Sequence, residues 1–297
     1  MQALQSTPVG TLAHAIAAPV ATLPPLLPAT YLFVPGNRPE RFAKALAAGA
    51  DCVILDLEDA VAPDDKALAR TAIQTWLLGL DTAQRGTVLV RINDALSPWH
   101  VDDLLMLRPA QVAGVMLSKS ECPRQIDKVM AALALGGHVV PLVETTQGVL
   151  NLQAIAAAAG VERLAFGALD YMLDLDLPGE GFASDLAATQ IAMASRAAGL
   201  PAPIAGVTPA LDAERVRADM LHARALGYGA KLCIHPMQVT AVRAALAPSA
   251  ADIAWAQRVI TAWNQGNGTG ALQLDGKMVD KPVVLRAARV LALAAQA

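Results

Sequence analysis

Charged side chains in this sequence stand where apolar, strand-like runs end. A β-strand that is buried on both faces reads as a continuous apolar run, so a charge at its carboxyl end has left the core. In a barrel of parallel strands, that end is the face on which active sites form. Four such runs end in Asp56 and Glu58, Arg91, Glu144 and Asp170. Carboxylates from different strands together with one arginine indicate a site for a hard metal ion and an anionic substrate.

Glu144 and Asp170 are the strongest candidates for metal ligands. Mg²⁺ prefers oxygen ligands and keeps several waters, so one or two carboxylates and substrate oxygens are enough to bind it. The alternative for either residue alone is a cap on the helix that follows, because Glu144 precedes two threonines and Asp170 precedes an apolar turn. The presence of both at matching strand ends favours Mg²⁺.

Arg91 ends the third strand-like run, and its planar fork suits bidentate binding of a carboxylate. The alternative is an ion pair with Asp56, Glu58 or Asp59, and the two roles are compatible. Strand alternation places Asp56 and Glu58 on one side, where one of them is expected to orient the arginine or a metal-bound water. Asp59 is expected to be a solvated loop acid.

Three further residues have less specific signals. Lys119 ends the fourth strand and could form a Schiff base, but a salt bridge to Glu121 or an anion contact is the simpler interpretation. His235 follows the last strand and is expected to be a hydrogen-bonded structural residue. Asp280 precedes Lys281 and Pro282, a pattern that predicts the N-cap of the last helix.

The elements that position these residues alternate between strand and helix, which predicts a parallel sheet. Strands are expected at 31–35, 53–58, 87–92, 113–118, 139–144, 163–168, 203–207 and 231–235. Helices are expected at 38–48, 64–79, 122–134, 147–158, 182–198 and 210–226. Eight units in about 210 residues fit a (β/α)₈ TIM barrel. A doubly wound open sheet is the alternative, but no GxGxxG motif follows any strand.

Three segments are expected along the chain: an arm at 1–29, a barrel domain at 30–248 and a C-terminal helical extension at 249–297. The arm contains no Lys or Arg and is interrupted by prolines, unlike a secretory signal or a membrane span. The extension is expected to contain helices at 250–264 and 281–296 with a short strand at 271–274. It is expected to pack on its own barrel or to reach a neighbouring subunit.

Bulk properties restrict the class of protein. The 297 residues carry a formal net charge of −3, which gives no electrostatic reason to expect nucleic acid or an anionic membrane as partner. The three cysteines lack metal-ligand spacing, and Cys52 and Cys233 lie in strand-like runs, where cysteine acts as a small buried hydrophobe. This sparse, odd number indicates a reducing compartment, so a cytoplasmic protein is expected.

The chain resembles the citrate lyase β-subunit-like family of the HpcH/HpaI aldolase/citrate lyase superfamily, the CoA-ester lyases that include malyl-CoA and citramalyl-CoA lyases. The matching stretches occur in family order from residue 31 onwards. They are YLFVPGNRPERFAKA, ADCVILDLEDAVAPDDKALAR, VLVRIN, VMLSKSE, VETTQG, FGALDYMLDLD, AKLCIHPMQ and DGKMVDKP. The resemblance implies a (β/α)₈ barrel with a C-terminal extension, assembled as a homotrimer or hexamer.

The resemblance also implies roles for individual residues. Glu144 and Asp170 match the family's Mg²⁺ ligands, and Arg91 matches the arginine that binds the substrate carboxylate. Glu58 matches a second-sphere acid. Asp280 matches the catalytic aspartate that the C-terminal segment of a neighbouring subunit supplies, a role compatible with capping.

Weaker matches concern substrate binding. Arg38, in the loop that matches the CoA-contacting region, is a candidate for a phosphate contact. Backbone amides of Gly167, Ala168 and Leu169 are candidates for holding the substrate carboxylate. The sequence departs from the family's common pattern at Ser118, where proline is frequent, and at 205–207, where Ala-Gly-Val replaces Asp-Gly-Val.

The expected function is an Mg²⁺-dependent carbon–carbon lyase. It would cleave a 3-hydroxyacyl thioester such as citryl-, malyl- or citramalyl-CoA to a 2-oxo acid and an acetyl thioester. The thioester is carried either by CoA or by an acyl carrier protein. The alternatives are a thioester hydrolase, a metal-free aldolase that uses Lys119, and a non-catalytic binding subunit.

Overall fold

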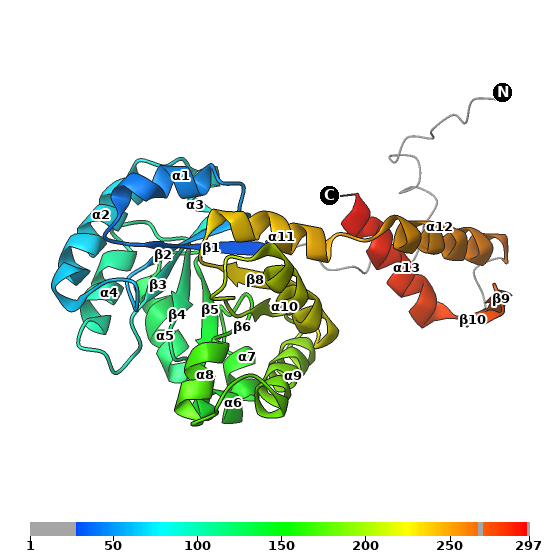
Figure 1. Ribbon diagram of the computed structural model, residues 1–297. Coiled ribbons are helices and arrows are strands. Elements are labelled where there is room, and N and C mark those ends of the chain that lie inside the picture. Colours follow the sequence, from blue (N-terminus) through cyan, green and yellow to red (C-terminus); the bar gives the residue numbers. More distant parts are fainter. Residues whose placement is uncertain (1–27, 267–269, 296–297) are drawn as a thin grey trace. The chain divides into compact units, whose positions relative to one another are not determined.

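The computed structural model describes residues 28–266 and 270–295 (Figure 1). The chain divides into two compact units after Leu246. Of the arm predicted for residues 1–29, all but Pro28 and Ala29 lie outside the described residues. None of the described helices combines the length and the apolar character that a membrane crossing requires.

The first unit contains a closed barrel of eight parallel strands in sequence order. β8 pairs with β1 and so closes the barrel, with Thr30 opposite Lys231. The strands are β1 Thr30–Pro35, β2 Cys52–Asp56, β3 Val88–Ile92, β4 Gly114–Leu117, β5 His138–Val143, β6 Ala165–Phe166, β7 Ile204–Ala205 and β8 Ala230–Cys233. The predicted (β/α)₈ barrel is therefore confirmed, although β6 and β7 are shorter than the predicted strands.

Helices surround the barrel, as Figure 1 shows. They are α1 Phe42–Leu46, α2 Lys66–Leu78, α3 Thr82–Arg85, α4 His100–Leu107, α5 Pro123–Ala132, α6 Thr146–Leu150, α7 Leu152–Ala156, α8 Ala168–Asp174, α9 Phe182–Ala197, α10 Ala213–Ala225 and α11 Pro236–Leu246. Short 3₁₀ turns, η4 Pro39–Arg41 and η5 Pro63–Asp65, precede α1 and α2. The sequence prediction missed α3, α4, α8 and α11, of which α8 matters most for the site.

The side chains of the strands alternate between two apolar layers. One set, which includes Ile54, Leu89, Val140 and Leu142, fills the barrel interior. The other set, which includes Leu55, packs in a larger cluster with the surrounding helices. This alternation has a period of two residues. The next members of the inward series on β2, β3 and β5 are therefore polar, and they lie at the carboxyl ends of the strands.

The second unit, from Ala247 onwards, contains α12 Ala250–Gln265, a hairpin and α13 Lys281–Ala294. Its own apolar cluster joins the two helices through residues such as Val259, Ile260 and Ala287. The hairpin strands, β9 Leu272–Leu274 and β10 Lys277–Val279, are joined by Asp275 and Gly276. Both turn residues have positive φ, 51° and 75°, which a two-residue hairpin turn requires. β10 was not predicted because three residues show no clear alternation.

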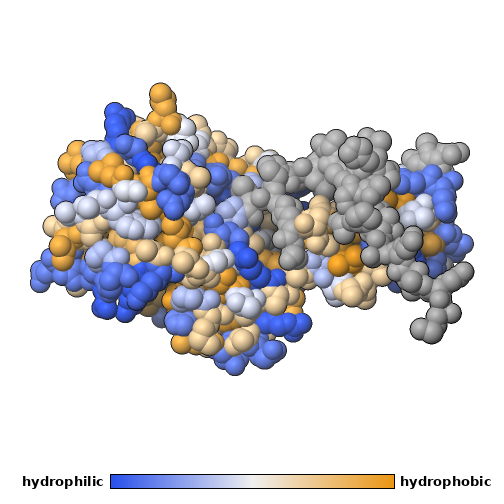
Figure 2. Space-filling model, turned by 90° about the horizontal axis from the view of Figure 1, so that it is seen from above, coloured by the Kyte–Doolittle hydropathy of each residue, from blue (hydrophilic) through white to orange (hydrophobic). Residues whose placement is uncertain are grey.

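Exposed surface of the barrel unit is mixed in character. In Figure 2, hydrophilic and hydrophobic residues are interspersed over the face that is visible. Single exposed apolar side chains are normal on a folded protein. The arrangement of the polar residues at the barrel mouth is therefore a more specific pointer to function than this surface.

Candidate active site

Arg91 is the centre of a charged network at the carboxyl ends of β2 and β3. Its Nε and Nη2 donate to the two carboxylate oxygens of Asp56 at 2.6 and 2.7 Å, and Nη1 lies 2.8 Å from Glu58 Oε2. The guanidinium lies over the ring of Phe33, 4.7 Å from its centroid. Burial lowers the pKa of Arg91, but Asp56 and Glu58 outweigh it and raise the pKa above its ordinary value. The predicted ion pair is thus confirmed, and Arg91 is permanently charged.

Asp56 also fixes the loop that follows β2. Its Oδ1 accepts the amide of Glu58 at 2.9 Å and its Oδ2 accepts the amide of Ala60 at 3.1 Å. The loop therefore folds back over the strand end and directs Glu58 towards Arg91. Asp59 remains largely exposed, with 63% of its side chain accessible, as predicted. Burial and the nearby Glu58 raise the pKa of Asp59 to about 6.

Lys119 joins this network from the next strand. Its Nζ lies 2.8 Å from Glu58 Oε1, so the salt bridge to Glu121, one of the two simpler alternatives for Lys119, is wrong. The backbone at Lys119 has a φ of 45°, a left-handed turn, and Glu121 instead accepts a hydrogen bond from the Thr145 hydroxyl at 2.9 Å. Burial lowers the pKa of Lys119, but the contact with Glu58 outweighs it and raises that pKa. A Schiff-base lysine needs a neutral amine, so this environment disfavours that role.

Glu144 directly follows β5 and is 2% exposed. Its Oε1 accepts the amide of Lys119 at 2.8 Å, and Gly167 packs so closely that a Cβ there would lie 2.3 Å from Oε2. Burial, followed by the negative charges of Asp170 and Glu58, raises the pKa of Glu144 to about 8. Such repulsion on a buried carboxylate is relieved when a cation binds to it.

Asp170 does not end a strand, contrary to the prediction. β6 stops at Phe166, and Gly167 is the N-cap of α8, so Asp170 lies in the first turn of that helix. The sequence missed this because the strand and helix are separated by a single glycine. Neither acid caps a helix: Gly167 caps α8 without a side-chain bond, and Thr145 caps α6 by accepting the Gly148 amide at 3.0 Å.

The donor set fits Mg²⁺ rather than a metal that needs a full protein cage. Within residues 28–266 and 270–295, no group of three or more His, Cys, Asp or Glu side chains is arranged to hold a metal. Glu144 and Asp170 would supply two oxygen ligands, and water and substrate would complete the coordination, as is usual for Mg²⁺.

One of the three backbone amides that were predicted to bind the substrate carboxylate is already engaged within the protein. The amide of Gly167 donates to Val143 O at 2.9 Å as part of the sheet, so it is not available to a substrate. The amides of Ala168 and Leu169 belong to the first turn of α8, where backbone donors have no acceptor within the helix. These two amides remain candidates.

Arg38 and Asp280 lie outside the network. Arg38 pairs with Glu40 at 2.8 Å and half of its side chain is exposed. Asp280 belongs to the second unit, where its Oδ1 accepts the amide of Val283 at 3.3 Å and so caps α13. The predicted cap is confirmed, and the catalytic role of Asp280 remains a proposal.

Two histidines, His235 and His100, contact backbone groups through Nδ1. The Nδ1 of His235 accepts the Met237 amide at 3.2 Å, which agrees with a structural role. His100 is buried, and its Nδ1 lies 2.8 Å from Asn93 O. His100 is the first residue of α4.

Sequence reasoning missed Lys66, which supports the network from α2. Its buried Nζ donates to Leu57 O at 2.7 Å, to Glu58 O at 2.8 Å and to Asn93 Oδ1 at 2.9 Å. Lys66 therefore holds the loop that carries Glu58. A signal was present: Lys66 lies on the same helical face as the buried Ala69 and Ile73, where the spacing predicts an apolar residue.

Comparison with known proteins identifies the family of the chain. The sequence model of the HpcH/HpaI aldolase/citrate lyase family matches residues 29–236. A citrate lyase subunit beta-like protein of Deinococcus radiodurans is 37% identical over 279 residues, which cover 90% of this chain and 98% of the relative. A (3S)-malyl-CoA thioesterase of Cereibacter sphaeroides is 33% identical over 89% of this chain and 93% of its own length.

A solved structure shares both the fold and much of the sequence. The protein CitE of Mycobacterium tuberculosis, crystallised with magnesium, acetoacetate and coenzyme A, superposes with a TM-score of 0.81 at 34% identity. The match covers 91% of this chain and 98% of that one. The family match, the relatives and the shared barrel lead to one conclusion: the chain belongs to the HpcH/HpaI aldolase/citrate lyase family, among its citrate lyase β-subunit-like members.

Proposed function

We propose that the protein is an Mg²⁺-dependent carbon–carbon lyase that cleaves a 3-hydroxyacyl thioester to a 2-oxo acid and an acetyl thioester. The observation that carries the proposal is the juxtaposition of two groups at the barrel mouth. One is the repelling acid pair Glu144 and Asp170, and the other is the network that fixes the cations of Arg91 and Lys119 on Glu58. The complex of the related CitE with magnesium, acetoacetate and coenzyme A supports the substrate class.

Glu144 and Asp170 would hold the ion. When bound, Mg²⁺ supplies Lewis-acid chemistry, which lowers the pKa of a substrate hydroxyl and stabilises negative charge on the oxygen that becomes a carbonyl. The amides of Ala168 and Leu169 would bind the carboxylate of the acid portion. The substrate is thereby oriented with its hydroxyl-bearing carbon next to the acid pair.

Arg91, which the resemblance assigned to the substrate carboxylate, would act on the thioester half instead, because Asp56 already occupies its Nε and Nη2. Breaking the carbon–carbon bond leaves its electron pair on the acetyl thioester as an enolate. Arg91 has N–H groups beyond those engaged with Asp56 and Glu58, and its fixed charge would stabilise the enolate oxygen. Glu58 is a positioning residue in this scheme, because it orients both Arg91 and Lys119.

Asp280 of a neighbouring subunit would complete the reaction. In cleavage it protonates the enolate carbon, and the substrate hydroxyl proton passes to solvent. In the condensation direction it removes the same carbon-bound proton. This role requires an assembly such as a homotrimer or hexamer, in which the extension at 249–297 serves the barrel of another subunit. CoA thioesters and the free thiols of Cys52 and Cys233 fit a cytoplasmic enzyme.

The second candidate is a thioester hydrolase. It is favoured by the malyl-CoA thioesterase relative, which is 33% identical. The same residues would bind the thioester, but water would attack the thioester carbonyl and the carbon–carbon bond would remain. The two functions differ in their products and not in their substrates.

Product analysis separates the candidates. Purified protein with Mg²⁺ is incubated with malyl-, citramalyl- and citryl-CoA, and the products are measured by mass spectrometry with and without EDTA. EDTA-sensitive release of a 2-oxo acid and acetyl-CoA from one substrate supports the lyase. Free CoA with the intact hydroxy acid supports the hydrolase. No product from any substrate would reject both for free CoA esters and direct the search to acyl-carrier thioesters.

A further inference from the structure

Lys231 is a buried charged residue of the barrel wall, and it lies on β8 between its register partners Thr30 of β1 and Ala205 of β7. Its neighbours Ala230 and Leu232 point into the barrel interior, whereas Cys233 packs in the cluster formed with the helices. By strand alternation, Lys231 also faces the helices. It is 4% exposed, and its Nζ donates to Gly206 O at 2.7 Å.

No acid in the described part of the chain forms an ion pair with Lys231. Its register partner on β7 is Ala205, whose methyl group supplies no charge. Asp219 is engaged elsewhere, with Arg215 Nε at 2.7 Å and the Thr208 hydroxyl at 2.6 Å. A buried ammonium is normally paired with an anion. Burial lowers the pKa of Lys231, and the nearby charge of Asp219 offsets part of this shift without forming an ion pair with the ammonium.

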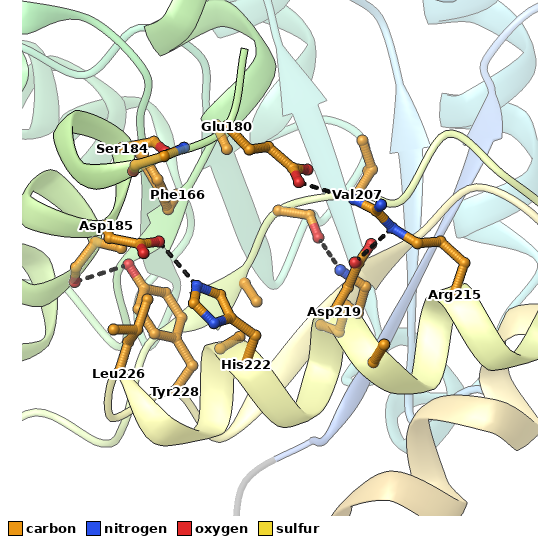
Figure 3. A pocket seen from close by; sticks show the side chains of 18 residues that line it. Phe166, Glu180, Ser184, Asp185, Val207, Arg215, Asp219, His222, Leu226 and Tyr228 are labelled. Atoms are coloured by element: carbon orange, nitrogen blue, oxygen red, sulfur yellow. Dashed lines mark hydrogen bonds and ion pairs between the residues drawn. The ribbon is translucent and has the colours of Figure 1, made fainter.

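A cavity of about 470 Å³ lies beside this lysine, between α9 and α10 (Figure 3). Its volume falls in the range of about 300–1,000 Å³ that is typical of small-molecule sites. Apolar groups supplied by Phe166, Ala188, Val207 and Leu226 line part of it. The cavity therefore combines an apolar lining with one buried cation.

The acids that line the cavity already have partners. Asp185 of α9 meets His222 of α10 at 2.8 Å, and Glu180 meets Arg215 at 2.8 Å; Figure 3 shows both pairs. Lys231 is thus the charged group of the lining that lacks a counter-ion among the described residues.

We propose that the cavity between α9 and α10 is a second ligand site, which binds a small monocarboxylate with its carboxylate on Lys231 Nζ and its alkyl chain on the apolar lining. This site lies beside the candidate active site and adjoins it at Ala168. Phe166 and Ala168 line the cavity, whereas Gly167 between them packs against Glu144. The proposal does not depend on the proposed lyase activity, because it requires binding alone.

Calorimetric titration of the full chain with sodium hexanoate, in EDTA, tests the proposal. One site is expected in the wild type and, with the same affinity, in Glu144→Gln, which changes only the barrel mouth. Lys231→Met should weaken binding by about tenfold, the loss expected for one charge-assisted hydrogen bond. Ala205→Asp should weaken it similarly by placing an internal carboxylate beside Lys231. Ala205→Asn is the matched control, because it adds the same volume without the charge, and it should bind more tightly than Ala205→Asp.

Several results would overturn the proposal. They are no binding of hexanoate to the wild type, loss of binding in Glu144→Gln, and equal affinity in Ala205→Asp and Ala205→Asn. Hexylammonium is the probe of opposite charge, and tighter binding of it than of hexanoate would mean that Glu180, Asp185 and Asp219 dominate the cavity. Thermal melts establish that each variant is folded, and if Lys231→Met does not fold, the pair at position 205 decides.

Discussion

Replacing Gly167 with alanine tests how the candidate metal site is built. A Cβ at this position would lie 2.3 Å from Glu144 Oε2 and 2.5 Å from Glu144 Cβ, well inside van der Waals contact. The Cβ of Glu144 is fixed next to the end of β5 and cannot swing aside as the tip of a flexible side chain can. The Glu144 carboxylate must therefore move, and overpacking of this kind costs ~1–3 kcal/mol.

The expected result is a loss of Mg²⁺ binding in a protein that remains folded. Displaced ligand geometry should weaken Mg²⁺ binding by about 10–100-fold, the range found when the groups that orient a metal ligand are changed. Calorimetry measures the dissociation constant, and a thermal melt measures the accompanying loss of stability. Gly179→Ala is the control, because a Cβ there would meet nothing within 4 Å. Unchanged Mg²⁺ affinity in Gly167→Ala would refute the assignment of Glu144 as a ligand.

Three further predictions concern the supporting residues, the metal and the second unit. Lys66→Met should lower the free energy of unfolding by ~1–3 kcal/mol, because the carbonyls of Leu57 and Glu58 lose a buried donor; chemical denaturation measures this, with the exposed Lys128→Met as control. Mg²⁺ at 100 times its dissociation constant should stabilise the wild type by ~2.7 kcal/mol and Glu144→Gln far less, and equal stabilisation of both would place the ion elsewhere. Asp280→Asn should keep the melting temperature, since asparagine also caps helices, but lower turnover by about 10²–10⁴-fold. Mixing the Asp280→Asn protein with the Glu144→Gln protein should restore part of the activity if each site is built from two subunits. No recovery of activity after subunit exchange would contradict a site shared between subunits.

The barrel could be predicted from the sequence because its strands are short apolar runs with polar ends. All eight strands lie within or overlap the predicted ranges. The ends of strands and helices next to a glycine were harder to predict. The run at 163–168 continues as an apolar sequence past Phe166, and periodicity does not reveal that the chain turns into α8 at Gly167. Asp170 was therefore found as a candidate ligand but placed on the wrong element.

The ion-pair partner of a charged residue could be predicted only when the two residues lie beside each other on adjacent strands. Asp56 and Arg91 are register partners on β2 and β3, and their ion pair was among the alternatives. For Lys119 the only partner named from the sequence was its neighbour Glu121, as one of two alternatives, but its partner Glu58 is 61 residues away. The backbone at Lys119 is left-handed, with a φ of 45°, and a lone lysine in a sequence does not indicate such a turn.

Deuterium incorporation into the acetyl product during turnover in heavy water tests the central claim most directly. The protein is incubated in D₂O with Mg²⁺ and the CoA ester that it turns over, and the products are resolved by mass. The lyase account predicts a 2-oxo acid together with acetyl-CoA that has gained one deuteron on its methyl carbon, because the enolate is protonated by an acid that exchanges with solvent. Free CoA together with the intact, undeuterated hydroxy acid would contradict it.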